Sequence, residues 1–200
     1  VRRKTPEDLA DILTSKLAED EYDFDKNPDY YWHGQNRKQI LRILARITDY
    51  LETEAHQHGE GYMKYVTTRG QKRYEVEHIW ANKPERHEDE FAHESEFHDC
   101  RNKIGGLLLL PKKFNASYGD LTYEKKRPHY NSQNIVARTL CDEAYDHNPG
   151  LRQFMDRTGI QLQPHAEFKK ADLETRQALY LELAKRVWDP ALITAELEEK

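Results

Sequence analysis

Cysteine is nearly absent from this sequence, and long hydrophobic runs are absent altogether. Only Cys100 and Cys141 occur in 200 residues, far apart and outside any CxxC spacing. This excludes a disulfide framework and a cysteine-based zinc knuckle, so a reducing cytoplasm is the expected location. The longest apolar run, residues 107–110, has the length of a strand and falls far short of the roughly 18 residues of a membrane span. We expect a protein with no membrane partner.

The composition is polar but rich enough in large side chains to fold. The chain has 34% charged residues and a mean hydropathy of −1.01, yet it contains 12 tyrosines, 6 phenylalanines and 3 tryptophans. A length of 200 residues suits one well-buried core. We therefore expect a single domain over residues 1–200. It would comprise a helical extension (1–70), a core (71–132) and a helical C-terminal part (133–200), and we interpret it as the C-terminal piece of a longer protein.

The net charge of −5 conceals a sharp division along the chain. Residues 81–100 carry seven acidic side chains against Lys83 and Arg86. Residues 101–130 reverse the balance, because Asp120 and Glu124 are their only acids and their bases are Arg101, Lys103, Lys112, Lys113, Lys125, Lys126 and Arg127. An anionic partner would bind along this second segment, although clusters of this kind are also common on ordinary solvated surfaces.

Hydrophobic periodicity predicts a mainly helical chain with two strands. Helical spacing predicts helices from Thr5–Pro6 onward, over residues 40–51, 132–147 and 151–157, and over about 172–188, with a turn at 148–150. Alternation at Tyr74, Val76 and His78 predicts one strand, and residues 104–110 predict a second, ended by Pro111. The fold class is therefore α+β, mainly helical.

The motif YEVEHIW at residues 74–80 has the residue types that phosphodiester hydrolysis needs. A neutral imidazole such as that of His78 can take a proton from water near neutral pH. A carboxylate and an amide oxygen make a hard donor set that suits Mg²⁺ or Mn²⁺, and Glu77 and Asn115 are the candidate ligands. Neighbouring strand residues point to opposite faces, so sharing one phosphate requires a strand that ends at the motif. The pattern predicts a strand, a second strand and a short helix carrying Asn115.

The same run of motifs resembles a known nuclease family. EHI, then RNKIGGLLLLP, FNASYGDLTYEKK and HYNS, over about residues 75–132, are similar to the C-terminal HNH (ββα-metal) domain of modification-dependent restriction and phage-defence enzymes of the GmrSD and SspE type. The resemblance implies a bacterial or archaeal metal-dependent DNA endonuclease or nickase. In that reading His78 is the general base, Asn102 orients it, and Glu77 and Asn115 hold Mg²⁺ or Mn²⁺. Two positions depart from the commonest pattern, since Glu77 replaces an aspartate and Asn115 a histidine.

The resemblance also implies the partners. These are double-stranded DNA, contacted by Lys112, Lys113, Lys125, Lys126 and Arg127, and an N-terminal domain that hydrolyses nucleotide and senses modified DNA. A single centre of this kind cuts one strand, so double-strand cleavage would require a dimer or two encounters.

Other readings of these residues stay open. The alternative function is a non-catalytic nucleic-acid-binding or regulatory module on the same fold, and the chemistry also allows a small-molecule phosphodiesterase or phosphatase. A zinc site could be drawn from four residues with irregular spacing: His87, His93, His98 and Cys100. Tyr118, Tyr123 and Tyr130 could stack on nucleic acid, but we expect at least two of them to pack in the core.

Overall fold

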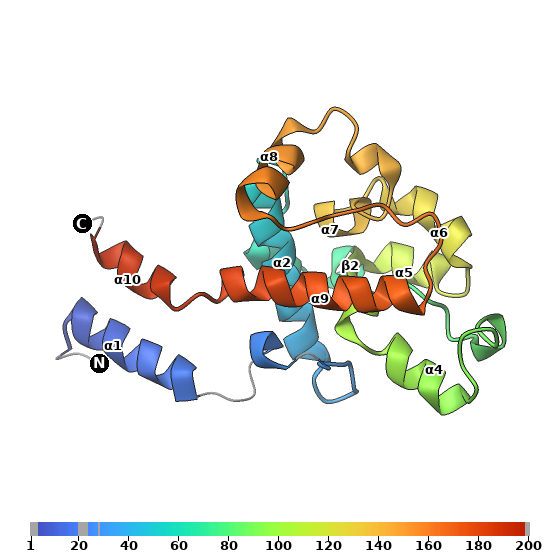
Figure 1. Ribbon diagram of the computed structural model, residues 1–200, viewed down its shortest axis with the longest axis horizontal. Helices are drawn as coiled ribbons and strands as arrows, with labels where there is room; N and C mark the ends of the chain where they lie inside the picture. The colour runs from blue at the N-terminus through green and yellow to red at the C-terminus, as the bar shows by residue number, and fades with distance from the viewer. Residues whose placement is uncertain (1–3, 20–23, 28, 199–200) are drawn as a thin grey trace.

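The computed structural model describes residues 4–19, 24–27 and 29–198, and helices make up most of it (Figure 1). The strands are β1 (Tyr74–His78) and β2 (Leu107–Pro111). The helices are α1 (Pro6–Glu19), α2 (Arg37–Glu54), α3 (Tyr62–Thr67), α4 (Glu94–Arg101), α5 (Lys112–Tyr118), α6 (Tyr123–Tyr130), α7 (Ile135–Arg138), α8 (Pro149–Thr158), α9 (Lys170–Val187) and α10 (Ala191–Glu198). Short 3₁₀ turns are η1 (Phe24–Lys26), η2 (Gly70–Lys72), η3 (Pro84–Arg86), η4 (Ile104–Gly106) and η5 (Asp142–Ala144). The predicted mainly helical α+β class is confirmed.

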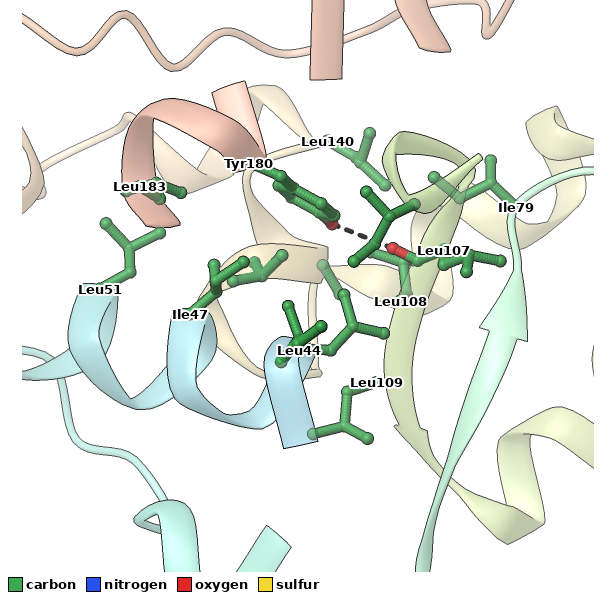
Figure 2. Packing of buried hydrophobic residues seen from close by; sticks show 14 of the residues in the cluster. Leu44, Ile47, Leu51, Ile79, Leu107, Leu108, Leu109, Leu140, Tyr180 and Leu183 are labelled. Carbon is green, nitrogen blue, oxygen red and sulfur yellow. Dashed lines mark hydrogen bonds between the residues drawn. The ribbon is translucent and has the colours of Figure 1, made fainter. Parts of the chain in front are cut away.

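The core forms where β2 meets α2 and α9. The apolar stripe of α2 packs against both: Leu44 and Ile47 lie on the side of Leu107–Leu109, and Leu51 lies beside Leu183 of α9 (Figure 2). All of these side chains are buried. Tyr180 of α9 closes the cluster from the other side, and its hydroxyl donates to the Leu107 carbonyl at 3.0 Å (Figure 2). Because β2 is covered so fully, it reads in the sequence as an unbroken leucine run rather than an alternating one.

The two strands pair antiparallel and leave the end of β1 at the edge of a loop. The register places Tyr74 opposite Pro111 and His78 opposite Leu107. One further hydrogen bond, from Ile79 N to Gly106 O at 2.9 Å, fixes the chain just past the strand. The ladder stops there, so the chain turns away directly after His78, as the motif predicted.

The second strand begins later than predicted. Residues 104–106 form η4 instead of extending β2, so the prediction of a strand from Ile104 was wrong. The reason is the approach of α9: a Cβ on Gly105 would lie 2.5 Å from backbone atoms of Leu173 and Gln177. The Gly105 amide also donates to Gln177 Oε1 at 2.7 Å instead of to a neighbouring strand. A backbone held this tightly against a helix cannot continue the ladder.

The helix α5 follows β2 without a gap and carries Asn115, so the predicted order of strand, strand and short helix is confirmed. Pro111 is both the last residue of β2 and the residue that caps α5. A proline fits both roles because it supplies no amide hydrogen to the ladder or to the first helical turn.

Two other predictions need correction. Residues 132–147 do not form one helix, since only α7 and η5 are helical there. Side chains from elsewhere bind the carbonyls of that segment: Arg127 and Tyr123 both donate to Leu140 O. Residues 148–150 are also more than a turn, because Asn148 caps α8 through its side chain and Pro149 begins that helix.

Helices α1 and α10 contact each other and lie to one side of the body (Figure 1). No helix in the described part of the chain has both the length and the apolar character needed to cross a membrane.

Candidate active site

His78 is held at the end of β1 by Asn102. The Nε2 atom of His78 lies 3.0 Å from Asn102 Oδ1, and Asn102 is the residue that ends α4. A side-chain carbonyl oxygen can only accept, so Nε2 carries the proton and Nδ1 is left as the acceptor nitrogen. This arrangement fixes both the orientation of the ring and its tautomer, with a basic nitrogen directed away from Asn102.

The surroundings of His78 keep its ring uncharged. The imidazole is half-buried and packs edge to face on Trp32, with ring centroids 5.1 Å apart. Burial, together with the nearby positive charge of Arg101, lowers the pKa of His78 to about 3. At neutral pH the imidazole is therefore in the form that can accept a proton. An anionic phosphate placed beside it would favour the imidazolium and raise that pKa toward the working range.

Glu77 lies on the other face of β1 and is paired with Lys126 of α6. Glu77 Oε1 and Lys126 Nζ are 2.6 Å apart, and both residues are buried, with exposures of 4% and 1%. The same ammonium donates to the backbone carbonyl of His78 at 2.9 Å. Burial raises the pKa of Glu77 and lowers that of Lys126, and each charge is the main compensation for the other. Lys126 thus connects α6 to Glu77 and to His78.

Asn115, on α5, contacts β1 at Glu75 and Val76. Its amide nitrogen donates to the Val76 carbonyl at 3.1 Å and lies 3.5 Å from Glu75 Oε2. Glu75 is itself held by Arg73, whose Nη2 is 2.6 Å from Glu75 Oε1. Since the Asn115 nitrogen is committed to the strand, its Oδ1 remains as the donor atom for a ligand.

Glu77 and Asn115 carry the oxygen types that a hard divalent cation prefers. Lys126 contacts Oε1 of Glu77, which leaves Oε2, and the amide of Asn115 offers Oδ1. Carboxylate and amide oxygens are the donors that Mg²⁺ and Mn²⁺ prefer. The pair is compatible with such an ion, and its role as the ligand set stays a prediction.

The suggested zinc residues do not assemble. In the described residues no group of three or more His, Cys, Asp or Glu side chains is arranged to hold a metal ion. His87 packs on Trp80 and lies 3.2 Å from Glu90, His98 pairs with Glu94, and Cys100 is buried. Burial raises the pKa of Cys100 to about 11, which disfavours the thiolate that zinc requires.

The five predicted DNA-contacting bases differ in their exposure to solvent. Lys113 and Lys125 are exposed and Lys112 is half-buried. Arg127 is half-buried and pairs with Asp142, and Lys126 is enclosed with Glu77. Helix α6 therefore presents Lys125 as its one fully exposed base.

Three further residues contribute to the site without a local sequence signal. Trp32 comes from a loop more than 40 residues before the motif and covers the His78 ring. Arg101 donates to the Trp80 carbonyl at 3.1 Å and brings a positive charge near His78. Tyr130 is buried near Glu77. Tyr123 is also buried, so the expectation that at least two of the three tyrosines pack in the core is confirmed. The exception, Tyr118, is half-buried and stacks on His129.

The candidate site thus combines a strand that ends at a histidine, a second strand and a short helix that carries Asn115, all within a helical domain. The family model described as the C-terminal domain of GmrSD restriction endonucleases matches residues 14–198, so the chain belongs to that family. Membership indicates a nuclease function of the restriction-endonuclease type, acting on DNA. No curated protein and no solved structure matches the chain.

Proposed function

We propose that this protein is a metal-dependent DNA endonuclease of the HNH type that cuts one strand at each encounter. The observation that carries the proposal is the His78–Asn102 contact at the end of β1. It holds the neutral imidazole of His78 in one tautomer at the end of β1. Glu77 precedes His78 on the same strand, and Asn115 contacts that strand from α5. Family membership supplies the reaction class and the substrate, DNA.

In this proposal His78 takes the proton from the attacking water through Nδ1. Asn102 holds the ring by accepting from Nε2–H, which keeps Nδ1 unprotonated and directed at the reacting phosphate. Trp32 covers the ring and limits its exposure to bulk water. The contribution expected from a positioned base of this kind is about 10²–10⁴ in rate.

Glu77 and Asn115 are the proposed ligands of Mg²⁺ or Mn²⁺. When bound, a divalent ion would compensate negative charge on the phosphoryl oxygens and on the leaving oxygen. Lys126 keeps the Glu77 carboxylate in place through its contact with Oε1, and Asn115 is oriented by donating to the Val76 carbonyl. The protein residues thus hold the acceptor atoms in position before any ligand arrives.

The role in the cell that we propose is the effector of a restriction or phage-defence system in a bacterial or archaeal cytoplasm. An N-terminal domain would sense modified DNA and hydrolyse nucleotide, and a dimer or a second encounter would be needed to cut both strands. The alternative is a non-catalytic module that binds nucleic acid on the same fold. The His78–Asn102 contact favours the nuclease, because a binding module has no need for a neutral base held in one tautomer.

Nicking of supercoiled plasmid distinguishes these functions. We expect the purified chain to convert supercoiled plasmid to open circles with Mg²⁺ or Mn²⁺ and to do nothing in EDTA. Binding of the plasmid without any conversion, over a full metal titration, would support the binding module instead.

A further inference from the structure

A basic surface that the sequence did not single out lies at the beginning of β1. Between residues 61 and 74 the chain contains four bases and no acid: Lys64, Arg69, Lys72 and Arg73. Arg69, Lys72 and Arg73 surround η2 and are exposed. The positive φ of Gly70, 69°, turns the chain here in a way that favours glycine. These three bases lie 28 or more residues before Arg101, where the basic segment recognised in the sequence begins.

The fold brings these bases against α5. Lys112 N donates to Arg73 O at 2.9 Å, next to the Tyr74–Pro111 pair of the sheet, and α5 contacts η2. Lys112 and Lys113 begin α5, so five positive side chains gather where β1 begins and β2 ends. We call this group, Arg69, Lys72, Arg73, Lys112 and Lys113, the η2–α5 surface.

Little in the protein neutralises the η2–α5 surface. Among the ion pairs of the described residues, Arg73 pairs with Glu75, and none involves Arg69, Lys72, Lys112 or Lys113. Like charges gathered in one region repel one another. A polyanion bound across them would offset that cost.

The η2–α5 surface leads directly to the candidate site. Arg73 holds Glu75 at 2.6 Å, and the other oxygen of that carboxylate is 3.5 Å from the amide nitrogen of Asn115. Beyond the opposite end of β1, the chain enters residues 81–100 with their seven acids. The net charge of the flanking segments therefore changes from basic to acidic along β1, which favours the approach of a phosphate backbone at the beginning of the strand.

We propose that duplex DNA reaches the site across the η2–α5 surface, with its phosphates on Arg69, Lys72, Lys112 and Lys113, rather than along α6. The inference rests on the proposed function, since it assigns a path to the same substrate. Lys125 would lie outside this path. Phosphate contacts of this kind give affinity and orientation but carry little sequence information.

The test is DNA affinity against salt concentration for a short fluorescent duplex in EDTA. The first variant is Arg69→Gln/Lys72→Gln/Lys113→Gln, which removes three exposed charges. The matched control is Lys16→Gln/Arg152→Gln/Lys185→Gln, which removes three exposed charges from α1, α8 and α9. If all three surface bases contact phosphates, the slope of log K against log salt should shrink by about 2.7. The control should keep the parent slope.

Equal slopes for the first variant and the control would overturn the path, as would a larger loss of slope from Lys125→Gln than from the first variant. Plasmid nicking by the parent is measured in parallel with Mn²⁺. If the parent nicks and the first variant keeps the parent slope, the path is disproved and the nuclease function is not. If the first variant has the smaller slope but the parent never nicks, the result supports the path and disproves the nuclease.

Discussion

Lys126 and Glu77 form a buried ion pair, 2.6 Å between Nζ and Oε1, with side-chain exposures of 1% and 5%. Two charges removed from water at such a site are each costly, and their contact compensates that cost only while both are present. Because the ammonium also donates to the His78 carbonyl, the pair fixes the end of β1 on which the base is placed. Lys126 is therefore a structural support of the site in this fold.

Lys126→Met should destabilise the protein strongly, because it leaves Glu77 buried without a partner. We expect a loss of about 3–5 kcal/mol in the free energy of unfolding, measured by denaturant titration. The neighbouring Lys125→Met is the control and should stay within about 0.5 kcal/mol of the parent, since Lys125 is exposed. The double variant Glu77→Gln/Lys126→Met should recover part of the loss. If Lys126→Met and Lys125→Met were equally stable, the result would contradict a buried pair.

His78→Ala should abolish nicking while leaving DNA affinity nearly unchanged. The expected loss in the single-turnover rate is about two to four decades, because the base that accepts the water proton is gone. Asn102→Ala should lose less, since the imidazole stays but its tautomer is no longer fixed. Thermal midpoints of both variants serve as the folding control. Undiminished cleavage by pure His78→Ala protein would refute the assignment of the base.

The sequence predicted the parts of this site that follow from local pattern. Alternation at residues 74–78 and the leucine run gave both strands, and Asn115 was placed correctly on a short helix after them. The His78–Asn102 pair was expected from the family resemblance alone, and the structure places the two side chains in contact. Local pattern was sufficient where the signal lies in neighbouring residues, as in the leucine run of β2, which is buried from Leu107 to Leu110.

Contacts between distant segments could not be predicted in the same way. Lys126 is 49 residues from Glu77 and sits in a KKR cluster that is typical of solvated surface, so its burial has no local signature. The prediction that β2 begins at Ile104 was wrong because α9, some 70 residues later in the chain, lies in close contact with Gly105. Trp32 belongs to a loop without periodicity, and nothing in that loop indicates contact with His78. Tertiary packing determined each of these features.

Asn115→Ala should change the metal requirement rather than DNA binding. Glu77→Ala should do the same and also lower stability, because it leaves Lys126 buried without its partner. Removing an oxygen ligand should raise the Mn²⁺ concentration needed for half-maximal nicking, by about 10-fold or more, or eliminate activity. Binding of Mn²⁺ to the protein alone, followed by electron paramagnetic resonance, should weaken in parallel. His98→Ala is the control, because His98 pairs with Glu94 on α4. If both variants titrate with Mn²⁺ like the parent, the ligands are other residues.

Glu52 makes the stability of the protein depend on pH, independently of the candidate site. Its carboxyl is 4% exposed and accepts from the Tyr65 hydroxyl at 2.8 Å. Burial raises the pKa of Glu52 to about 7, above its unfolded value of 4.5. Between these values the folded state holds a proton that the unfolded state has lost. The contribution of Glu52 is therefore fully present below pH 4.5 and is lost as the pH rises through 7.

Glu52→Gln should remove this dependence, because an amide keeps an acceptor for Tyr65 and never ionises. At pH 8 we expect the variant to be more stable than the parent by about 1–2 kcal/mol, or roughly 2–8 °C in Tm for a chain of this length. At pH 4.5 the two should differ little. Glu60→Gln is the control, since Glu60 is an exposed carboxylate paired with Lys64, and its Tm curve should parallel that of the parent. A Glu52→Gln curve that also parallels the parent from pH 4.5 to 8 would show that folding does not raise the pKa of Glu52.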